Sequence, residues 1–197
     1  FVSRDYNIIF EEHISFFTKN TLKNIILLNG FNIIDFQVFQ YPFEDALTVI
    51  IKKSKTRNNP LLSRDIKKDK VLFTNFSRDF PIVKNAITTF FKSKATEGSI
   101  VFYGAGHHGI TFINFMNIGR YVNCFVDDLK EKHNFYTPGS KLPIYGSDYL
   151  SNNNITLCVV SVSQENEDKI IDKIKSKKHQ FDILSIFPSS KYALPIY

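Results

Sequence analysis

The chain has 197 residues, of which 43% are hydrophobic, and carries a formal net charge of +6. This composition is typical of a globular protein and is enough for one large or two small domains, which excludes a disordered or low-complexity chain. The densest basic cluster, Lys52 to Lys70, contains no aromatic side chain and is interpreted as a solvated linker, so we expect no nucleic-acid partner. No apolar run approaches the roughly 18 residues of a membrane helix and no signal peptide is recognised, so we expect a soluble, cytoplasmic protein without a membrane partner.

The first part of the chain, residues 1–53, predicts one helix and two strands. Residues 18–30 combine a helix start signal, apolar side chains at helical spacing and an Asn-Gly end signal. Residues 31–39 and 46–52 have the apolar pattern of strands. Three such elements do not bury a stable core alone. We therefore expect them to be the last elements of an incomplete α/β domain, and the chain beginning at Phe1 to be part of a longer protein.

The polar segment 54–69 predicts a linker, and residues 70–197 predict a Rossmann-like α/β domain. The apolar run at 154–162 is continuous, as expected for a strand buried on both faces of a parallel sheet. We expect a mostly parallel sheet with helices on both faces. In chain order its elements are a helix over 81–94, a strand from 99, a helix, a strand ending before Asp127, a loop over 137–146, the strand at 154–162, a helix over 164–178 and a strand over 181–187.

A glycine-rich segment follows the strand at 99–103 and suggests a phosphate-binding loop. The order of strand, Gly-x-Gly-x-x-Gly, helix and acid-ended strand is typical of the opening βαβ unit of a dinucleotide-binding domain. Gly104 permits the tight turn, Gly106 lets the backbone approach a pyrophosphate, and Gly109 lets the helix pack close to the sheet. The helix N-terminus then offers N–H groups to an anion. Asp127 has the spacing of a ribose-binding carboxylate.

Two histidines and two cysteines have more than one interpretation. His107 and His108 lie in the glycine-rich segment and either contact a diphosphate or sugar or are turn residues exposed to solvent. Cys124 and Cys158 lie in apolar strands and are interpreted as reduced core thiols, in preference to a disulfide or a metal-binding pair. The histidines and cysteines show no metal-ligand spacing, so we expect no metal site.

An adjacent carboxylate and imidazole, Glu12 and His13, lie near the start of the chain. Such a pair can act as an acid–base pair, although it is also common on surfaces and at helix caps. The segment Glu12-His13-Ile-Ser-Phe-Phe-Thr precedes a helix that ends in Gly30-Phe31. This order resembles the end of the methyltransferase domain in S-adenosylmethionine-dependent sugar C-methyltransferases. Phe10 and Glu11 stand where that family has Tyr and His.

The resemblance continues after the linker in the order that the family has. Tyr103-Gly-Ala, the acid at Asp127, the Thr137-Pro-Gly-Ser segment and the Pro143-Ile pair resemble the family's C-terminal domain. The resemblance thus covers nearly the whole chain. It implies a division into the tail of a class I methyltransferase domain (1–53), the linker (54–69) and a Rossmann-like C-terminal domain (70–197).

The resemblance also implies a reaction. His13, with Glu12 beside it, would remove a proton from the sugar carbon next to a ketone, and that carbon would then take a methyl group from S-adenosylmethionine. The implied substrate is a nucleotide-linked deoxy-keto sugar, and the residues expected to bind it are Gly104, Gly106, His107, His108, Gly109 and Asp127. The upstream region of the family binds S-adenosylmethionine, so we expect no cofactor within this chain and no turnover by the chain alone.

Two other functions remain open from the sequence. One is an NAD(P)-dependent oxidoreductase built on the Gly104–Gly109 segment, although little chain follows Asp128 for a separate catalytic domain. The other is a non-catalytic nucleotide-binding module. The oligomeric state, the nucleotide base and the sugar are not predicted.

Overall fold

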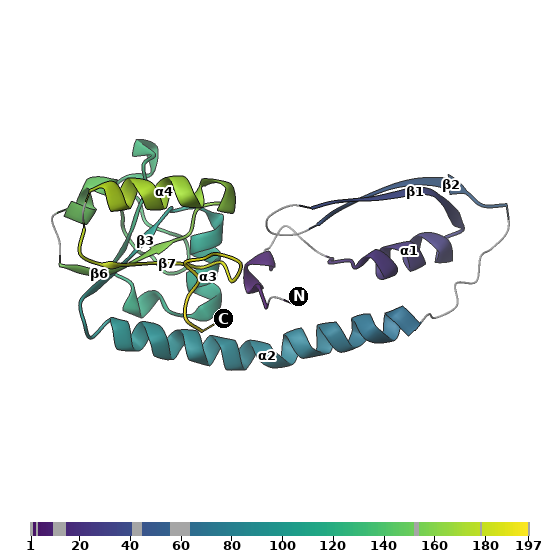
Figure 1. Cartoon of the computed structure of the whole chain (residues 1–197), viewed down its shortest axis with the longest axis horizontal. Coiled ribbons are helices and arrows are strands. Elements are labelled where there is room, and N and C mark those ends of the chain that lie inside the picture. Colours follow the sequence, from purple (N-terminus) through teal and green to yellow (C-terminus); the bar gives the residue numbers. More distant parts are fainter. Residues whose placement is uncertain are drawn as a thin grey trace. The chain divides into compact units, whose positions relative to one another are not determined.

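The computed structural model describes residues 2, 4–9, 15–40, 45–55, 64–151, 154–177 and 179–196. The chain divides into two compact units (Figure 1). The first unit comprises Phe1–Val2 and Ile8–Arg78, and the second comprises Ser3–Asn7 and Asp79–Tyr197. The long helix α2 (Arg64–Lys94) contributes residues to both units. Within the described part of the chain, no helix combines the length and the apolar character needed to cross a membrane.

The first unit contains the helix and the two strands that the sequence predicts. Thr18 caps the helix, because its hydroxyl accepts the Thr21 N–H while the Thr21 hydroxyl accepts the Thr18 N–H. Gly30 follows the helix with φ of +78°, a conformation that favours glycine. The two strands pair antiparallel with a register shift between Ile33 and Asp35. The elements are α1 (Lys19–Leu28), β1 (Phe31–Phe39) and β2 (Ala46–Lys53).

Large apolar side chains of the first unit are exposed. Ile34 on β1 is 62% exposed, Ile50 on β2 is 57% exposed and Leu28 at the end of α1 is 55% exposed. Two strands and a helix bury too little apolar surface to cover both faces of the sheet. The assignment of residues 1–53 to the tail of a methyltransferase domain stays a prediction.

The second unit contains a five-stranded parallel sheet with the order β5-β4-β3-β6-β7. This confirms the Rossmann-like fold class. The strands are β3 (Ser99–Tyr103), β4 (Cys124–Val126), β5 (Ile144–Tyr145), β6 (Ile155–Val160) and β7 (Asp182–Ser185). The helices are α3 (His107–Met116) and α4 (Gln164–Ser176), and the short 3₁₀ turns are η1 (Tyr6–Ile8), η2 (Gly119–Tyr121), η3 (Lys130–Lys132) and η4 (Ser147–Ser151).

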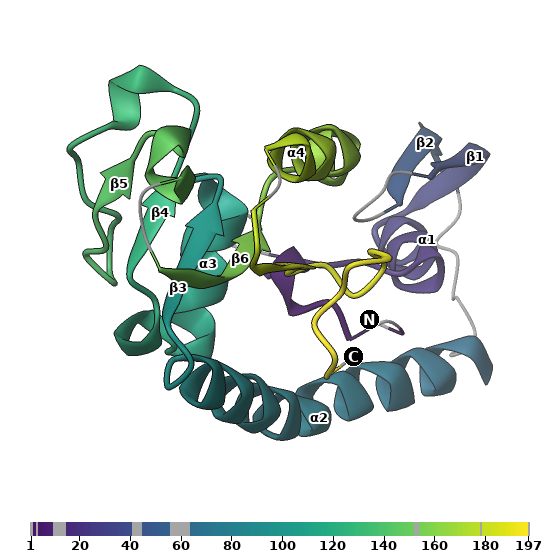
Figure 2. The same ribbon diagram turned by 60° about the vertical axis from the view of Figure 1, so that its left-hand side comes forward.

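The two faces of this sheet are covered by different helices (Figures 1 and 2). Ile171 and Ile174 of α4 pack on one face, against side chains that include Val101 and Cys158. On the other face Phe102 packs among aromatic rings, with ring centroids 5.8, 6.3 and 5.5 Å from those of Phe91 in α2, Phe112 in α3 and Phe125 in β4.

The strand order also places a topological switch point beside β3. From β3 the chain proceeds to β4 and β5 towards one side of the sheet, and from β6 it proceeds to β7 towards the other side. Because parallel crossovers are right-handed, α3 and α4 lie on opposite faces. Ligands of open α/β sheets bind where the order reverses, outside the carboxyl ends of the strands. In this sheet that position lies between the loops that follow β3 and β6.

Two sequence expectations about elements are wrong. The helix predicted over 81–94 begins at Arg64, so residues 64–69 of the predicted linker are helical. Proline is common in the first turn of a helix, so the sequence predicted that the helix begins at Pro81. In the structure Pro81 lies inside the helix. Within the predicted loop 137–146, Ile144–Tyr145 forms the edge strand β5. A two-residue strand is too short to show a periodic pattern.

The aromatic face of the sheet leads to a stability prediction. Phe102 is fully buried, so Phe102→Ala removes a large side chain and leaves a cavity, at a cost of about 3–5 kcal/mol. Phe135→Ala is the matched control, because Phe135 in the same unit is 65% exposed. Urea-induced unfolding of the two variants measures the difference. Equal losses of stability in both would contradict the assigned core.

Candidate functional site

The Gly loop, residues 104–109, connects β3 to α3 at the carboxyl edge of the sheet. Gly104 has φ of +100°, and its N–H donates to the Val126 carbonyl at 2.8 Å. A Cβ on Gly104 would lie 2.7 Å from Cγ1 of Val162, in the loop after β6. The turn therefore requires glycine for its conformation and for its close approach to the neighbouring loop.

Gly109 brings α3 close to the sheet. A Cβ at this position would lie 2.9 Å from both Cε1 of Phe125 and Cβ of Ser161. The Ser161 hydroxyl lies within donating distance of two carbonyl oxygens at the start of the Gly loop, that of Tyr103 at 3.1 Å and that of Gly104 at 3.0 Å. The loops after β3 and β6 are thus joined beneath the helix.

Gly106 differs from the other two glycines because the space around it is open. It is the N-cap of α3, with extended backbone, and a Cβ built on it would meet nothing within 4 Å. The first-turn N–H groups of a helix have no acceptor inside the helix, and the dipole there favours negative charge. A ligand phosphate can therefore approach the backbone at Gly106.

Asp127 joins the loop after β4 to the Gly loop. Its side chain is 7% exposed. Its Oδ2 accepts the Ala105 N–H at 2.8 Å and the Lys132 ammonium at 2.9 Å, and its Oδ1 accepts the Leu129 N–H at 2.9 Å. His133 Nε2 lies 2.8 Å from the Asp127 carbonyl. The carboxylate that the sequence associates with a ribose is therefore bonded to three donors of its own chain.

Three side chains that were not predicted as site residues meet on the α4 face of the same edge. The Tyr103 hydroxyl donates to Asp128 at 2.8 Å, and the Lys173 ammonium donates to Asp128 at 2.6 Å and to the Tyr103 oxygen at 3.2 Å. The adjacent acids at the end of β4 were the available signal, but Lys173 lies in the last turns of α4, far along the chain.

The electrostatics of this cluster keep all three groups in their ordinary ionisation states at neutral pH. Burial, with the hydrogen bond to Asp128, raises the pKa of Tyr103 to about 12. Burial also acts to raise the pKa of Asp128, but hydrogen bonds from Lys173 and Tyr103 outweigh it and lower that pKa below its ordinary value. The cluster therefore ties α4 to the sheet edge as an ion pair with a protonated phenol.

The two histidines of the Gly loop have different environments. His107 is exposed, whereas His108 is partly buried and makes an edge contact with Phe187, with ring centroids 5.5 Å apart. Burial, with the nearby His107, lowers the pKa of His108 below its ordinary value of 6.5. The imidazole of His108 is therefore neutral at pH 7, and the interpretation as a solvent-exposed turn residue applies only to His107.

Comparison with known proteins agrees with this architecture. The family model described as the C-methyltransferase C-terminal domain matches residues 63–182, more than half of the chain. The chain belongs to this family. The resemblance to C-methyltransferases seen in the sequence is thereby confirmed.

The other comparisons add little to the family assignment. No curated protein matches the chain. The crystal structure of UDP-D-quinovosamine 4-dehydrogenase from Vibrio fischeri is similar to the chain with 26% sequence identity and a TM-score of 0.36, over 46% of this chain and 78% of that one.

The residues expected to carry the chemistry, Glu12 and His13, lie outside the described residues. Their role as a catalytic pair in this C-methyltransferase family member stays a prediction. Among the residues that the structure does describe, no three His, Cys, Asp or Glu side chains are grouped to hold a metal ion. Cys124 and Cys158 are free, buried thiols.

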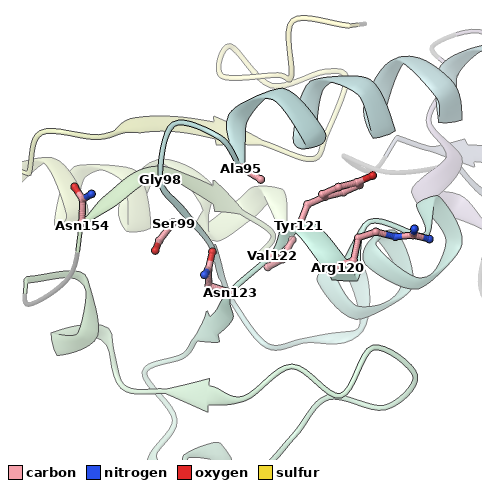
Figure 3. Close-up of a pocket in the computed structure, with 8 residues that line it drawn as sticks. All are labelled: Ala95, Gly98, Ser99, Arg120, Tyr121, Val122, Asn123 and Asn154. Atoms are coloured by element: carbon pink, nitrogen blue, oxygen red, sulfur yellow. The ribbon is translucent and has the colours of Figure 1, made fainter.

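A pocket of about 350 Å³ lies at the opposite edge of the sheet (Figure 3). Ser99 begins β3, and Asn123 and Asn154 precede β4 and β6. Figure 3 shows the side chains of Arg120 and Tyr121 extending away from Asn154, so the polar groups do not converge on one point. Ligands of open α/β sheets bind at the carboxyl edge. The Gly loop is therefore the candidate site.

The hydrogen bonds that Asp127 accepts lead to a stability prediction that compares two adjacent acids. Asp127→Asn removes the partner of Lys132 and at least one acceptor of a buried N–H, so we expect a loss of about 1–3 kcal/mol in unfolding free energy. Asp128→Asn disrupts a pair whose side chains are 41% and 42% exposed, so the loss should stay within about 1 kcal/mol. Urea-induced unfolding measures both. A larger loss of unfolding free energy for Asp128→Asn than for Asp127→Asn would contradict the role assigned to the Asp127 hydrogen bonds.

The partly buried His108 leads to a pH prediction. Because its pKa is lower in the folded chain than in the unfolded chain, its contribution to stability is present above a pH of about 6.5 and is lost as the pH falls below that value. His108→Gln should therefore lose less stability on acidification than the unsubstituted chain. NMR titration of the imidazole should give a midpoint below 6.5. A midpoint at or above that value would contradict the packing described for this ring.

Proposed function

We propose that the chain is the C-terminal part of an S-adenosylmethionine-dependent sugar C-methyltransferase, and that its second unit binds the nucleotide-linked sugar at the Gly loop. Membership of the C-methyltransferase C-terminal domain family supports the reaction class. The observation that carries the binding role is the geometry of the Gly loop. The loop packs tightly against neighbouring residues at Gly104 and Gly109, whereas the space around Gly106, at the start of α3, is open.

This geometry suits a nucleoside diphosphate for two reasons. The open space at Gly106 lets phosphate oxygens approach the backbone, where the helix dipole favours negative charge. The close packing of Gly104 and Gly109 keeps the loop in one shape before the ligand arrives, so binding does not have to order it. His107 and the neutral imidazole of His108 are the side chains of the loop that can hydrogen-bond the ligand.

The chemistry in this proposal needs a base, because a carbon next to a ketone is not a nucleophile until it loses a proton. His13 takes that proton, and Glu12 orients the imidazole and raises its basicity. The Gly loop follows this segment in the chain, so it does not serve as the S-adenosylmethionine site. S-adenosylmethionine, held by the upstream region, supplies the methyl group.

The oxidoreductase alternative has less support from the geometry. The dinucleotide-binding motif uses a free acid at the end of the second strand to bind the ribose hydroxyls. In this chain Asp127 is 7% exposed and already accepts from Ala105, Leu129 and Lys132. A ribose would have to displace one of these donors, at the cost of leaving it without its acceptor.

The test compares two substitutions at Gly106, to aspartate and to asparagine, whose side chains have the same shape but differ in charge. Aspartate and asparagine are both good N-cap residues, and the open space accepts either side chain, so both variants should fold. The aspartate places a negative charge where the diphosphate binds. We expect Gly106→Asp to weaken the binding of UDP or dTDP at least tenfold more than Gly106→Asn does, as measured by isothermal titration calorimetry.

Three results would contradict parts of this proposal. Equal affinities of the two Gly106 variants would remove the Gly loop as the phosphate site. Tight binding of NADH without binding of UDP or dTDP would favour the oxidoreductase. In the complete protein with its upstream region, full methyl transfer by His13→Ala would remove His13 as the base, whereas lost transfer with retained nucleotide binding would separate the enzyme from a binding module.

A further inference from the structure

Residues Arg4–Asn7, which we name the strap, belong to the second unit, although the rest of that unit begins only at Asp79. Figures 1 and 2 both show this purple segment beside the yellow C-terminal segment that follows β7. No pattern in the sequence indicated this placement. The strap is therefore part of the unit that carries the Gly loop.

The strap is held by buried polar groups. Asp5 and Asn7 are 7% and 6% exposed. Oδ1 of Asp5 accepts both the backbone N–H and the side-chain N–H of Asn7 at 2.9 Å. Nδ2 of Asn7 also donates to the carbonyl of Ile186 at 3.1 Å. Burial raises the pKa of Asp5, so the carboxylate is held there at a cost.

An aromatic side chain anchors the middle of the strap. Tyr6 is 2% exposed, and its ring meets that of Phe80 in α2 edge-on, with centroids 5.1 Å apart. Phe80 in turn packs on Phe115 of α3, with centroids 4.7 Å apart. At the end of the strap Arg4 pairs with Asp79 at 2.9 Å, and the Arg4 side chain is 58% exposed. The apolar packing of Tyr6 attaches the strap to the second unit, whereas the directional hydrogen bonds of Asn7 fix its position relative to Ile186.

The strap reaches the Gly loop through two residues. Ile186, which accepts from Asn7, is followed by Phe187, and both are fully buried. Phe187 makes the edge contact with His108 in the Gly loop. A continuous set of contacts therefore runs from Asn7 through Ile186 and Phe187 to the loop that we assign to the nucleotide.

We propose that Asn7 is a positioning residue for substrate binding, because it holds Ile186–Phe187 and, through them, the His108 side of the Gly loop. The role in binding rests on the proposed function, whereas the contacts do not. Glu12 and His13 lie five and six residues along the chain from Asn7.

The test compares two variants of the strap in the full 197-residue chain. Asn7→Leu keeps the approximate size of the side chain and removes the donor to Ile186. Arg4→Ala is the matched control, because it removes the ion pair with Asp79 and leaves the hydrogen bond from Asn7 to Ile186 intact. Asn7→Ser, whose shorter side chain does not span to Ile186, replaces Asn7→Leu if that variant does not fold.

Two readouts separate this proposal from the proposed function. The first, without ligand, is NMR titration of His108: Asn7→Leu should raise its midpoint towards 6.5, and Arg4→Ala should not. The second is calorimetric affinity for UDP and dTDP, which Asn7→Leu should weaken at least threefold. An unchanged His108 titration, or unchanged affinity in folded Asn7→Leu, overturns the positioning role. If the unsubstituted chain binds neither nucleotide, the proposed function fails, and the His108 titration alone decides whether the strap acts on the loop.

Discussion

The carboxylate of Asp127 is the interaction on which the candidate site depends. It accepts from Ala105 in the Gly loop and from Leu129 in the loop after β4, and it pairs with Lys132. Because a buried carboxylate is costly unless its oxygens are bonded, the two loops are stabilised only in the arrangement that supplies these donors. The shape of the Gly loop is thus specified by a neighbouring loop as well as by its glycines.

The same edge of the sheet is supported on its two faces in different ways. On one face the Tyr103, Asp128 and Lys173 cluster ties α4 to the strand ends through hydrogen bonds and an ion pair. On the other, the start of α3 packs directly on the sheet because Gly109 has no side chain. The position at Gly106 is open, so a nucleotide bound as we propose would meet a preformed surface.

Much of the second unit could be predicted from sequence, because its signals are local. The Gly loop has a fixed spacing, and the continuous apolar run of β6 is typical of a parallel strand. The start of α2 was misplaced because Pro81 satisfies a helix-start rule while the surrounding residues continue the helix. The strand β5 was missed because pairing with β4, rather than any pattern of its own, makes Ile144–Tyr145 a strand.

The sequence by itself determined the family, the parallel α/β class and the glycine positions of the candidate site. These follow from spacing and periodicity, which neighbouring residues along the chain carry. Only the tertiary structure decided that Asp127 is bonded to its own chain, that Lys173 joins Tyr103 and Asp128, and that Asn7 binds beside β7. The physical reason is that these hydrogen bonds join different loops, helices and strands, so they exist only once the sheet has brought their donors and acceptors together.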